Sequence, residues 1–288
     1  MSTAITKQPT TEELEERVHS AANALTTLAD SMEDAELGVR VLHLATLTNP
    51  TLKGMDDEDR ASIPRLFLCQ NITASDLKPD DCRPGQFFNS MSENLGNEIV
   101  FIPIKGHSIR RKWGEEKVEC ASLDGKTGFK YGSCDVCPFG QFEKGVTPSC
   151  SPGYSYYIMT EDLKSLYRAE FIKSSSSVGR NIKRLALPPA LWSRSFTLSS
   201  EHVKEPNRNY YKQKVATTGR RVSPEHMEIC DKLHDFFDAM HQAAILSQAG
   251  YAKRLASQDT ETGSINTAGE EIKVTDEDPE VLDFSTSM

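Results

Sequence analysis

Four cysteines in the middle of the chain place the strongest restriction on how it can fold. Cys120, Cys134, Cys137 and Cys150 have the spacing C-x13-C-x2-C-x12-C. Two cysteines separated by two residues can direct both thiolates at one tetrahedral ion, and two distant cysteines can complete the shell. Many glycines and few large apolar residues lie between them, so a bound metal would supply much of the folding free energy. The spacing therefore predicts a structural Zn²⁺ site.

Other chemistry stays open for the same cysteines. Four thiolates also hold iron–sulfur clusters. A thioredoxin-like redox pair at Cys134 and Cys137 fits less well, because no strand–helix–strand pattern surrounds it. A site closed by four cysteines leaves no coordination position for a substrate, so we expect neither metal catalysis nor enzyme activity. The sequence also lacks the HExxH motif, the Walker A loop and the deaminase HxE–PCxxC arrangement.

Charge is distributed unevenly along the 288 residues. The formal net charge is −9, but residues 105–221 contain 21 Lys and Arg against 11 Asp and Glu, a net charge of +10. A basic centre between acidic ends is typical of a domain that binds a polyanion. An ordinary solvated surface is the alternative. The few acids of this stretch form no cluster for Mg²⁺ ions, which argues against a nuclease.

Composition and cysteine number indicate the compartment. Hydrophobic residues make up 38% and charged residues 26% of the chain, which is typical of a globular protein. Seven cysteines are an odd number, and this argues against a secreted disulfide framework. The polar start of the chain has no apolar core of a signal peptide, and no apolar run is long enough for a membrane span. We expect an intracellular protein without a membrane partner.

Helices are predicted at both ends of the chain. Residues 11–47 read as helix, opened by a capping box of Thr10 and Glu13. Apolar residues there recur every three or four positions, which fits a coiled coil, a helical hairpin or a helix packed on its own domain, and allows a homo-oligomer. A second helix starts after Ser223, with Pro224 in its first turn.

Short strands are predicted between these helices. Six runs rich in β-formers have no strand–helix alternation, which suggests an antiparallel sheet or a small barrel. We also predict a single helical turn over residues 160–166 and a mobile serine loop over residues 173–179. The six runs are Arg65–Ile72, Glu98–Lys105, Tyr154–Met159, Arg168–Lys173, Ser195–Ser200 and Tyr210–Thr217.

These segments give an α+β organisation with four parts. Residues 1–60 form an N-terminal helical region and linker, and residues 61–222 form the core. The four-cysteine element, residues 120–150, is an insertion in that core. Residues 223–250 form the C-terminal helix. Residues 251–288 read as a disordered acidic tail, because they are polar and acids predominate toward the end.

Aromatic and basic residues alternate on several predicted strands. A strand over residues 210–215 would place Tyr210, Lys212 and Lys214 on one face and Tyr211 and Val215 on the other. An aromatic ring that stacks on a base, followed by cations for the phosphates, is what single-stranded nucleic acid requires. The candidate nucleic-acid contacts are Arg110, Arg111, Lys112, Trp113, Lys173, Arg180, Lys183, Arg184, Arg194, Tyr210, Lys212 and Lys214.

With these motifs assembled, the chain resembles a group of tailed-bacteriophage proteins in which a β-barrel carries a four-cysteine element. The resemblance covers about residues 63–222 and is strongest in the cysteine spacing. It rests on Gly85-Gln86-Phe87, Leu95–Ile99, Arg110 and Arg111 before Trp113, Cys120, Asp124-Gly125, Cys134-x-x-Cys137-Pro138, Cys150, Phe171–Ser175, Phe196–Ser199 and Tyr210-Tyr211.

The resemblance implies a phage early or replication protein in the cytoplasm of an infected bacterial host. It implies an OB-like antiparallel barrel with a zinc-ribbon insertion that binds single-stranded DNA without sequence preference, in replication, recombination or transcription. The acidic tail is similar in kind to those with which single-strand-binding proteins recruit replication partners, although Phe284 is not terminal. The alternative is a phage transcription cofactor that binds RNA polymerase.

Overall fold

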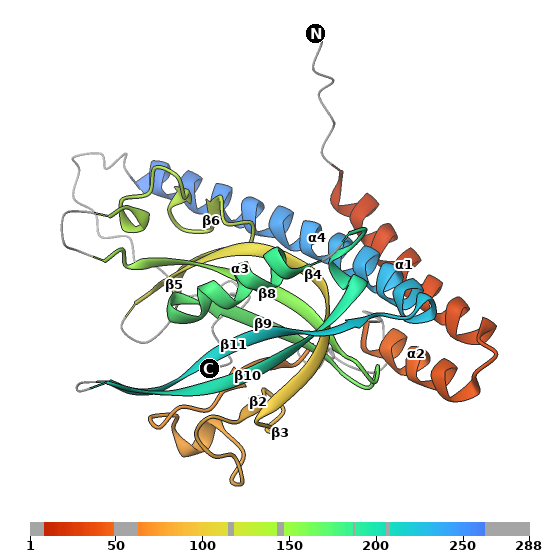
Figure 1. The fold of residues 1–288 in the computed structure, drawn as a ribbon. Helices are drawn as coiled ribbons and strands as arrows, with labels where there is room; N and C mark the ends of the chain where they lie inside the picture. Colours follow the sequence, from red (N-terminus) through yellow and green to blue (C-terminus); the bar gives the residue numbers. More distant parts are fainter. Residues whose placement is uncertain are drawn as a thin grey trace, which may run out of the picture.

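The computed structural model describes residues 9–48, 63–114, 118–142, 147–186, 188–205 and 208–262. They form a mixed α+β fold in which one large curled sheet is packed against helices from both ends of the chain (Figure 1). The helices are α1 (Thr11–Ser31), α2 (Ala35–Thr48), α3 (Ser176–Leu185) and α4 (Pro224–Thr262). Within these residues, none of the helices has the length and hydropathy of a membrane span.

The main sheet has nine strands, in the order β11-β10-β4-β8-β9-β1-β2-β3, and β5 pairs with β4 outside this path. All pairs are antiparallel except that of β1 with β9, where Arg65 is the register partner of Arg168. Each of the six predicted strands coincides with an observed one. The strands are β1 (Arg65–Leu68), β2 (Phe87–Asn89), β3 (Asn94–Gly96), β4 (Glu98–Trp113), β5 (Val118–Ser122), β8 (Cys150–Thr160), β9 (Leu166–Ile172), β10 (Arg194–Glu205) and β11 (Arg208–Arg221).

Side chains close the curl of the sheet by joining its two ends. The Gln70 carboxamide donates from Nε2 to the Tyr211 carbonyl and accepts from the Tyr211 amide at Oε1, both at 2.8 Å. Ser200 Oγ donates to the Gly85 carbonyl at 2.6 Å. A Cβ on Gly85, whose φ is +91°, would lie 2.6 Å from the Tyr211 ring, so only glycine allows this approach. The β1–β2 end is thereby fixed to β10–β11, and the sheet is compatible with an OB-like barrel.

The sheet separates two apolar cores. Inside the curl, Phe101, Phe171 and Phe196 are almost completely buried together with Val178 and Ile182 of α3. On the opposite face, residues of β4, β8 and β9 pack against α1, α2 and α4 (Figure 1). Alternate residues of one strand therefore enter different cores, as the twofold repeat of a strand requires.

Helix α3 replaces the mobile serine loop that we predicted over residues 173–179, and that prediction was wrong. Val178 and Ile182 are four residues apart and both bury against the sheet, so packing outweighs the weak helix propensity of the serines. Tyr156 Oη donates to the Gly179 carbonyl at 2.7 Å. A Cβ on Gly179 would lie 2.6 Å from Tyr154 Cβ, which shows how closely the helix approaches β8.

The helical turn predicted over residues 160–166 is also absent. Residues 161–163 form a tight turn between β8 and β9, and Leu163 has a φ of +60°. The Thr160 hydroxyl does not cap a helix but accepts from the Ser165 amide at 3.0 Å, across the turn. A side chain that bonds to nearby backbone here stabilises the turn rather than a helix.

The N-terminal region forms a hairpin of two helices rather than one helix over residues 11–47. The capping box predicted at Thr10 and Glu13 is present. The first helix ends at Ser31, because the backbone of the following Met32 is extended, and the Asp34 carboxylate accepts from the Glu36 and Leu37 amides to begin the second helix. The apolar seam of α1 packs within the chain, on α4, so a coiled coil is not needed to explain it.

Helix α4 starts as predicted, with Ser223 Oγ accepting from the His226 amide at 3.2 Å. Cys230, Leu233 and Phe237 are completely buried against the sheet and α1. The helix continues to Thr262, twelve residues past the predicted end at Gly250. The rest of the predicted acidic tail lies outside the described residues.

Candidate functional site

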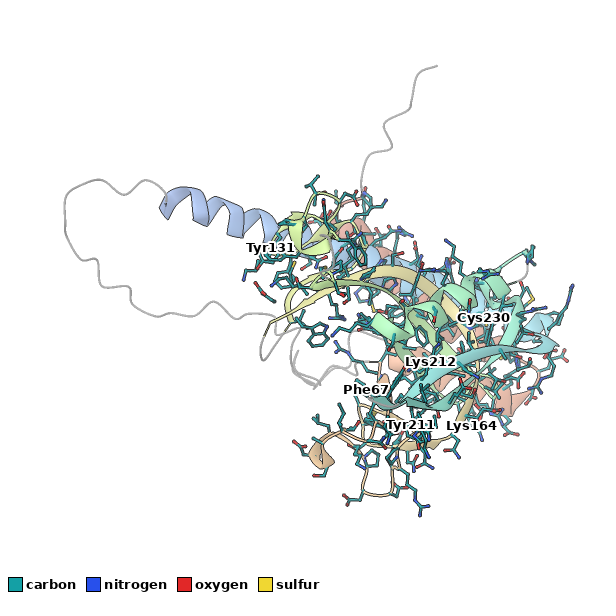
Figure 2. All side chains as sticks on the ribbon, turned by 60° about the vertical axis from the view of Figure 1, so that its left-hand side comes forward. Phe67, Tyr131, Lys164, Tyr211, Lys212 and Cys230 are labelled. Carbon is teal, nitrogen blue, oxygen red and sulfur yellow. The ribbon has the colours of Figure 1, made fainter. Side chains whose placement is uncertain are left out.

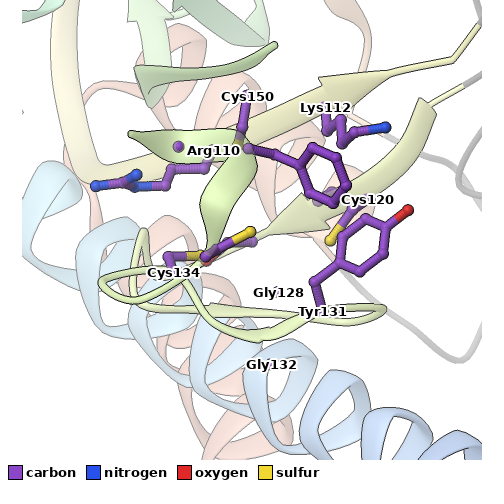
Figure 3. Close-up of a pocket in the computed structure, with 13 residues that line it drawn as sticks. Arg110, Lys112, Cys120, Gly128, Tyr131, Gly132, Cys134 and Cys150 are labelled. Atoms are coloured by element: carbon purple, nitrogen blue, oxygen red, sulfur yellow. The ribbon is translucent and has the colours of Figure 1, made fainter. Parts of the chain in front are cut away.

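The structure brings the four spaced cysteines together around one pocket (Figure 3). Lys112 of β4 is the register partner of Cys120 in β5 and of Cys150 in β8, so these two cysteines flank one residue of the sheet. Cys134 and Cys137 follow the small ribbon of β6 (Thr127–Gly128) and β7 (Gly132–Ser133). The sheet supplies two of the thiols, and the tight ribbon supplies the other two.

Glycines provide the room that closely grouped cysteines need. A Cβ on Gly128 would lie 2.8 Å from Cys120 Sγ, and one on Gly140 would lie 2.8 Å from the Arg110 guanidinium. Gly132 has a φ of +68°, which gives the turn between β6 and β7. This cradle, with four soft sulfur donors, fits Zn²⁺ better than harder cations that prefer oxygen.

The thiols themselves remain separate. All seven cysteines are free. Across the described ranges, no three His, Cys, Asp or Glu side chains are grouped so that they could hold a metal ion as they stand. Burial raises the pKa of the Cys134 and Cys150 thiols, and the neighbouring Arg110 guanidinium acts in the opposite direction. A cation beside the pocket favours the thiolate form that ligates a metal.

A polar network surrounds the pocket, and the sequence alone did not indicate it. Glu119 contacts both the Lys112 ammonium and the Tyr131 hydroxyl. These two hydrogen bonds lower the pKa of Glu119 to about 2. The Lys112 ammonium also lies 4.4 Å from the centroid of the Phe139 ring. The sequence held one signal for this network, the aromatic residues Tyr131 and Phe139. Large rings in a glycine-rich segment usually pack against a neighbouring side chain.

Among the candidate nucleic-acid contacts, one group shares the outer surface around α3. Arg180, Lys183 and Arg184 are exposed on α3, while Val178 and Ile182 bury its opposite face. Lys173, just before α3, is exposed, and its ammonium lies 5.9 Å from the centroid of the Trp113 ring. Trp113 is 36% exposed, which leaves part of the ring open. We call Trp113, Lys173, Arg180, Lys183 and Arg184 the α3 surface.

A second group lies on β11, with the faces as predicted. Val215 points into the inner core and Tyr211 packs over Gly85, so Tyr210, Lys212 and Lys214 take the other face. Figure 2 shows Lys212 on the β10–β11 hairpin, apart from Tyr131 of the cysteine element. Lys214 is ion-paired with Glu201 at 2.8 Å. Because that carboxylate offsets part of the positive charge, this face is a weaker anion site than the α3 surface.

The remaining candidates support the fold. Arg111 is only 7% exposed, and its guanidinium bonds to the Glu170 carboxylate at 2.6 Å. Arg194 donates to the Leu185 carbonyl at 3.1 Å and so holds the end of α3. Arg110 lines the cysteine pocket. Runs of basic residues in a sequence do not distinguish such buried pairs from exposed cations.

Comparison with protein-family models, with curated proteins and with solved structures found no match. The cysteine pocket and the α3 surface are the two features of the structure that point to a function.

Proposed function

We propose that this protein binds single-stranded DNA, with little sequence preference, along the α3 surface. The observation that carries the proposal is the grouping of four exposed cations and a partly exposed tryptophan on the solvent side of α3, whose other side packs inside the curled sheet. Cations neutralise phosphates, and an open indole ring can stack on any base. Neither feature reads base identity, so we expect no strong preference between sequences.

No acidic residue within α3 offsets the positive charge of this helix. Its ten residues, SSVGRNIKRL, contain three cations and no acid. Arg180, Lys183 and Arg184 are spaced by three and four residues, which places them on one side of the helix. The buried side of α3 fixes that side relative to the sheet. The helix backbone is thus held in place before binding, whereas the long side chains of these cations lose rotamer freedom when they contact a polyanion.

For the cysteine pocket we propose a structural Zn²⁺ ion held by Cys120, Cys134, Cys137 and Cys150. The support is the cradle of glycines around four thiols and the positive charge of Arg110 beside them. Bound zinc supplies a tetrahedral cross-link between strands and ribbon, as in a zinc-ribbon insertion. Trp113 lies next to Lys112 on the same strand, so the element would also fix one end of the α3 surface.

The cellular role we propose is to hold single strands during phage DNA replication, recombination or transcription, without catalysing a reaction. The protein would act in the cytoplasm of the infected host, alone or as a homo-oligomer. This role follows the expectation drawn from the sequence motifs, and a curled sheet compatible with an OB-like barrel is in keeping with it.

Fluorescence anisotropy of labelled oligo-dT, duplex DNA and RNA at two salt concentrations tests the proposal. Binding through phosphates weakens as salt rises, with a log–log slope of about −0.7 for each phosphate contacted on a single strand. We expect oligo-dT to bind more tightly than duplex DNA and to lose affinity with salt. Equal binding to single strands and duplex, or binding that salt does not change, contradicts it.

A second candidate is protein docking by the cysteine element, for example on an RNA polymerase. Val136 and Phe142 are 75% and 84% exposed, and both lie close to Cys137 in the sequence. A contiguous patch of exposed apolar side chains is typical of a contact site, and this function requires the two side chains to share one patch. A polymerase subunit that stays bound to the protein after nuclease treatment, and is lost in Phe142→Ser, favours this function. Loss of the subunit on nuclease treatment favours DNA binding.

A further inference from the structure

Two cysteines outside the pocket lie together at the opposite end of the sheet. Cys69 follows β1 and Cys82 precedes β2, and the two are 0% and 2% exposed. They share a small core with Phe88, against which Phe67 packs. The strands β1 and β2 are antiparallel neighbours, so the chain returns beside Cys69 after thirteen residues.

The backbone holds these two cysteines in register. The Cys69 amide donates to the Gln86 carbonyl, and the Gly85 amide donates to the Cys69 carbonyl, each at 2.9 Å. Residues 85 and 86 follow Cys82 closely, so these bonds fix its approach to Cys69. Both thiols lie in the same small core, where the Cys69 thiol donates to the Gln70 carbonyl at 3.7 Å and the Cys82 thiol donates to the Arg83 carbonyl at 4.0 Å. Cys230, by comparison, is buried in the helix-side core without a second cysteine among its packed neighbours.

The segment between the two cysteines is weakly anchored except at its ends. Ile72 is 92% and Leu77 is 42% exposed, so the segment buries little apolar surface and can open locally. Its first residue, Gln70, is the one that holds the Tyr211 backbone, and Asn71 donates to the Asn209 carbonyl at 3.2 Å. Any covalent closure of this segment also fixes the contact that joins β1–β2 to β11.

We propose that Cys69 and Cys82 are a disulfide-forming pair that low-molecular-weight disulfides oxidise, and that the bond locks the segment that clasps β11. In the first step one thiolate attacks glutathione disulfide, forms a mixed disulfide and releases one glutathione thiolate. The second cysteine then attacks the mixed disulfide and releases the second glutathione. The protein loses two protons and two electrons, and one glutathione disulfide becomes two glutathiones.

The reaction has a defined pH dependence. Burial, together with the neighbouring Cys69, raises the pKa of the Cys82 thiol to about 11. Only the thiolate attacks a disulfide, so the reaction is slow near neutrality and faster as the pH rises. Local opening returns the thiols to water and provides the access that the closed structure denies.

The test is to incubate the full-length protein with glutathione disulfide, alkylate the remaining thiols and map tryptic peptides. Peptide 66–105 contains Cys69 and Cys82 and no other cysteine, since prolines follow Lys78 and Arg83. We expect this peptide to become resistant to alkylation, without retained glutathione, and to recover both thiols after reduction. In Cys69→Ser the same peptide should instead retain one glutathione, because the resolving thiol is missing.

Amide exchange gives a second measurement on the unmutated chain. In the oxidised protein we expect exchange at the Tyr211 amide to slow by about tenfold or more, whereas exchange at the amide of Ala186, which caps the end of α3 by donating to the Ile182 carbonyl, stays unchanged. Two outcomes overturn the proposal. One is that peptide 66–105 keeps two alkylatable thiols, or one glutathione on each cysteine, after oxidation. The other is that the disulfide forms but leaves exchange at Tyr211 unaltered.

Discussion

A single side chain, the Gln70 carboxamide, takes the place of a peptide group on the edge of β11. It donates to the carbonyl and accepts from the amide of Tyr211, as a neighbouring strand would. The contact joins residues 141 positions apart in the sequence. No local pattern marks such a residue, because its partner is a backbone group and backbone groups occur at every position.

Glu170 is a half-buried carboxylate that two arginines share. Its carboxylate accepts from Arg111 at 2.6 Å and lies 2.7 Å from the Arg168 guanidinium. Burial acts to raise the pKa of Glu170, but the attraction of Arg168 and Arg111 outweighs it and the pKa is lowered. A carboxyl with a depressed pKa in the folded state stabilises the fold above its unfolded pKa.

We expect this stabilisation to be lost as the pH falls below the ordinary carboxyl value of 4.5 and through the lowered folded value. Glu170→Gln removes the charge and should cost about 3 kcal/mol of unfolding free energy at pH 7, since the buried Arg111 and the half-buried Arg168 lose the carboxylate that they share. Urea unfolding at pH 7 and pH 3 measures both effects. A variant as stable as the native protein at pH 7 would show that the pair contributes nothing. Glu201→Gln, in an exposed pair, is the matched control.

At the scale of elements, helix α3 determines where the exposed cations lie. Its position depends on Gly179, where α3 touches β8. In an isolated helix, Gly→Ala is stabilising by up to about 1 kcal/mol. Here the added Cβ would lie 2.6 Å from Tyr154 Cβ. This steric clash, rather than helix propensity, determines whether the substitution stabilises or destabilises the protein.

We therefore expect Gly179→Ala to destabilise the protein by about 1–3 kcal/mol, against the usual helix propensity. Ser177→Ala, at an exposed position of the same helix, should change stability by less than about 0.5 kcal/mol. Thermal or urea unfolding of both variants distinguishes the steric clash of the added methyl group from the gain in helix propensity. A gain in stability for Gly179→Ala would mean that α3 lies farther from β8 than described.

The cysteine element should depend on metal. Cys137→Ser removes one of four ligands, and we expect the zinc content of the purified protein to fall from about one ion per chain to near zero. Cleavage by trypsin at Lys126 and Lys130 should accelerate, while α4 remains protected. Elemental analysis and limited proteolysis check this, with Cys230→Ala as the control that keeps its zinc. Equal zinc content in both variants would contradict the four-cysteine site.

Elements were predictable where local periodicity agrees with burial. All six predicted strands and the starts at Thr10 and Ser223 were found, because alternation and caps are local signals. Helix α3 was missed because its serines are typical of a loop. Its two buried residues, Val178 and Ile182, favour a helix only because the sheet is there for them to pack against. The break at residues 32–34 was missed because the apolar seam continues across it.

At the scale of the whole molecule, the exposed cations of α3 and the three helices of the larger apolar core lie on opposite faces of one sheet. The helices α1, α2 and α4 cover one face, while α3 and its cations lie on the other (Figure 1). The basic centre of the sequence predicted a cationic surface, but not which cations would be exposed. Arg111 is used inside the fold, whereas Arg180, Lys183 and Arg184 face solvent. Tertiary packing determines which cations are buried and which are exposed, and a count of charges in the sequence gives no information on that packing.

The most direct test of the account is the salt dependence of oligo-dT binding by the triple variant Arg180→Gln, Lys183→Gln, Arg184→Gln. These side chains are exposed, so the fold should be retained, and Lys164→Gln on the β8–β9 turn is the matched control. We predict that the triple variant binds at least about tenfold more weakly and that its log–log salt slope is shallower by about two, whereas the control binds like the native protein. Unchanged affinity and slope in a folded triple variant would contradict single-strand binding along the α3 surface.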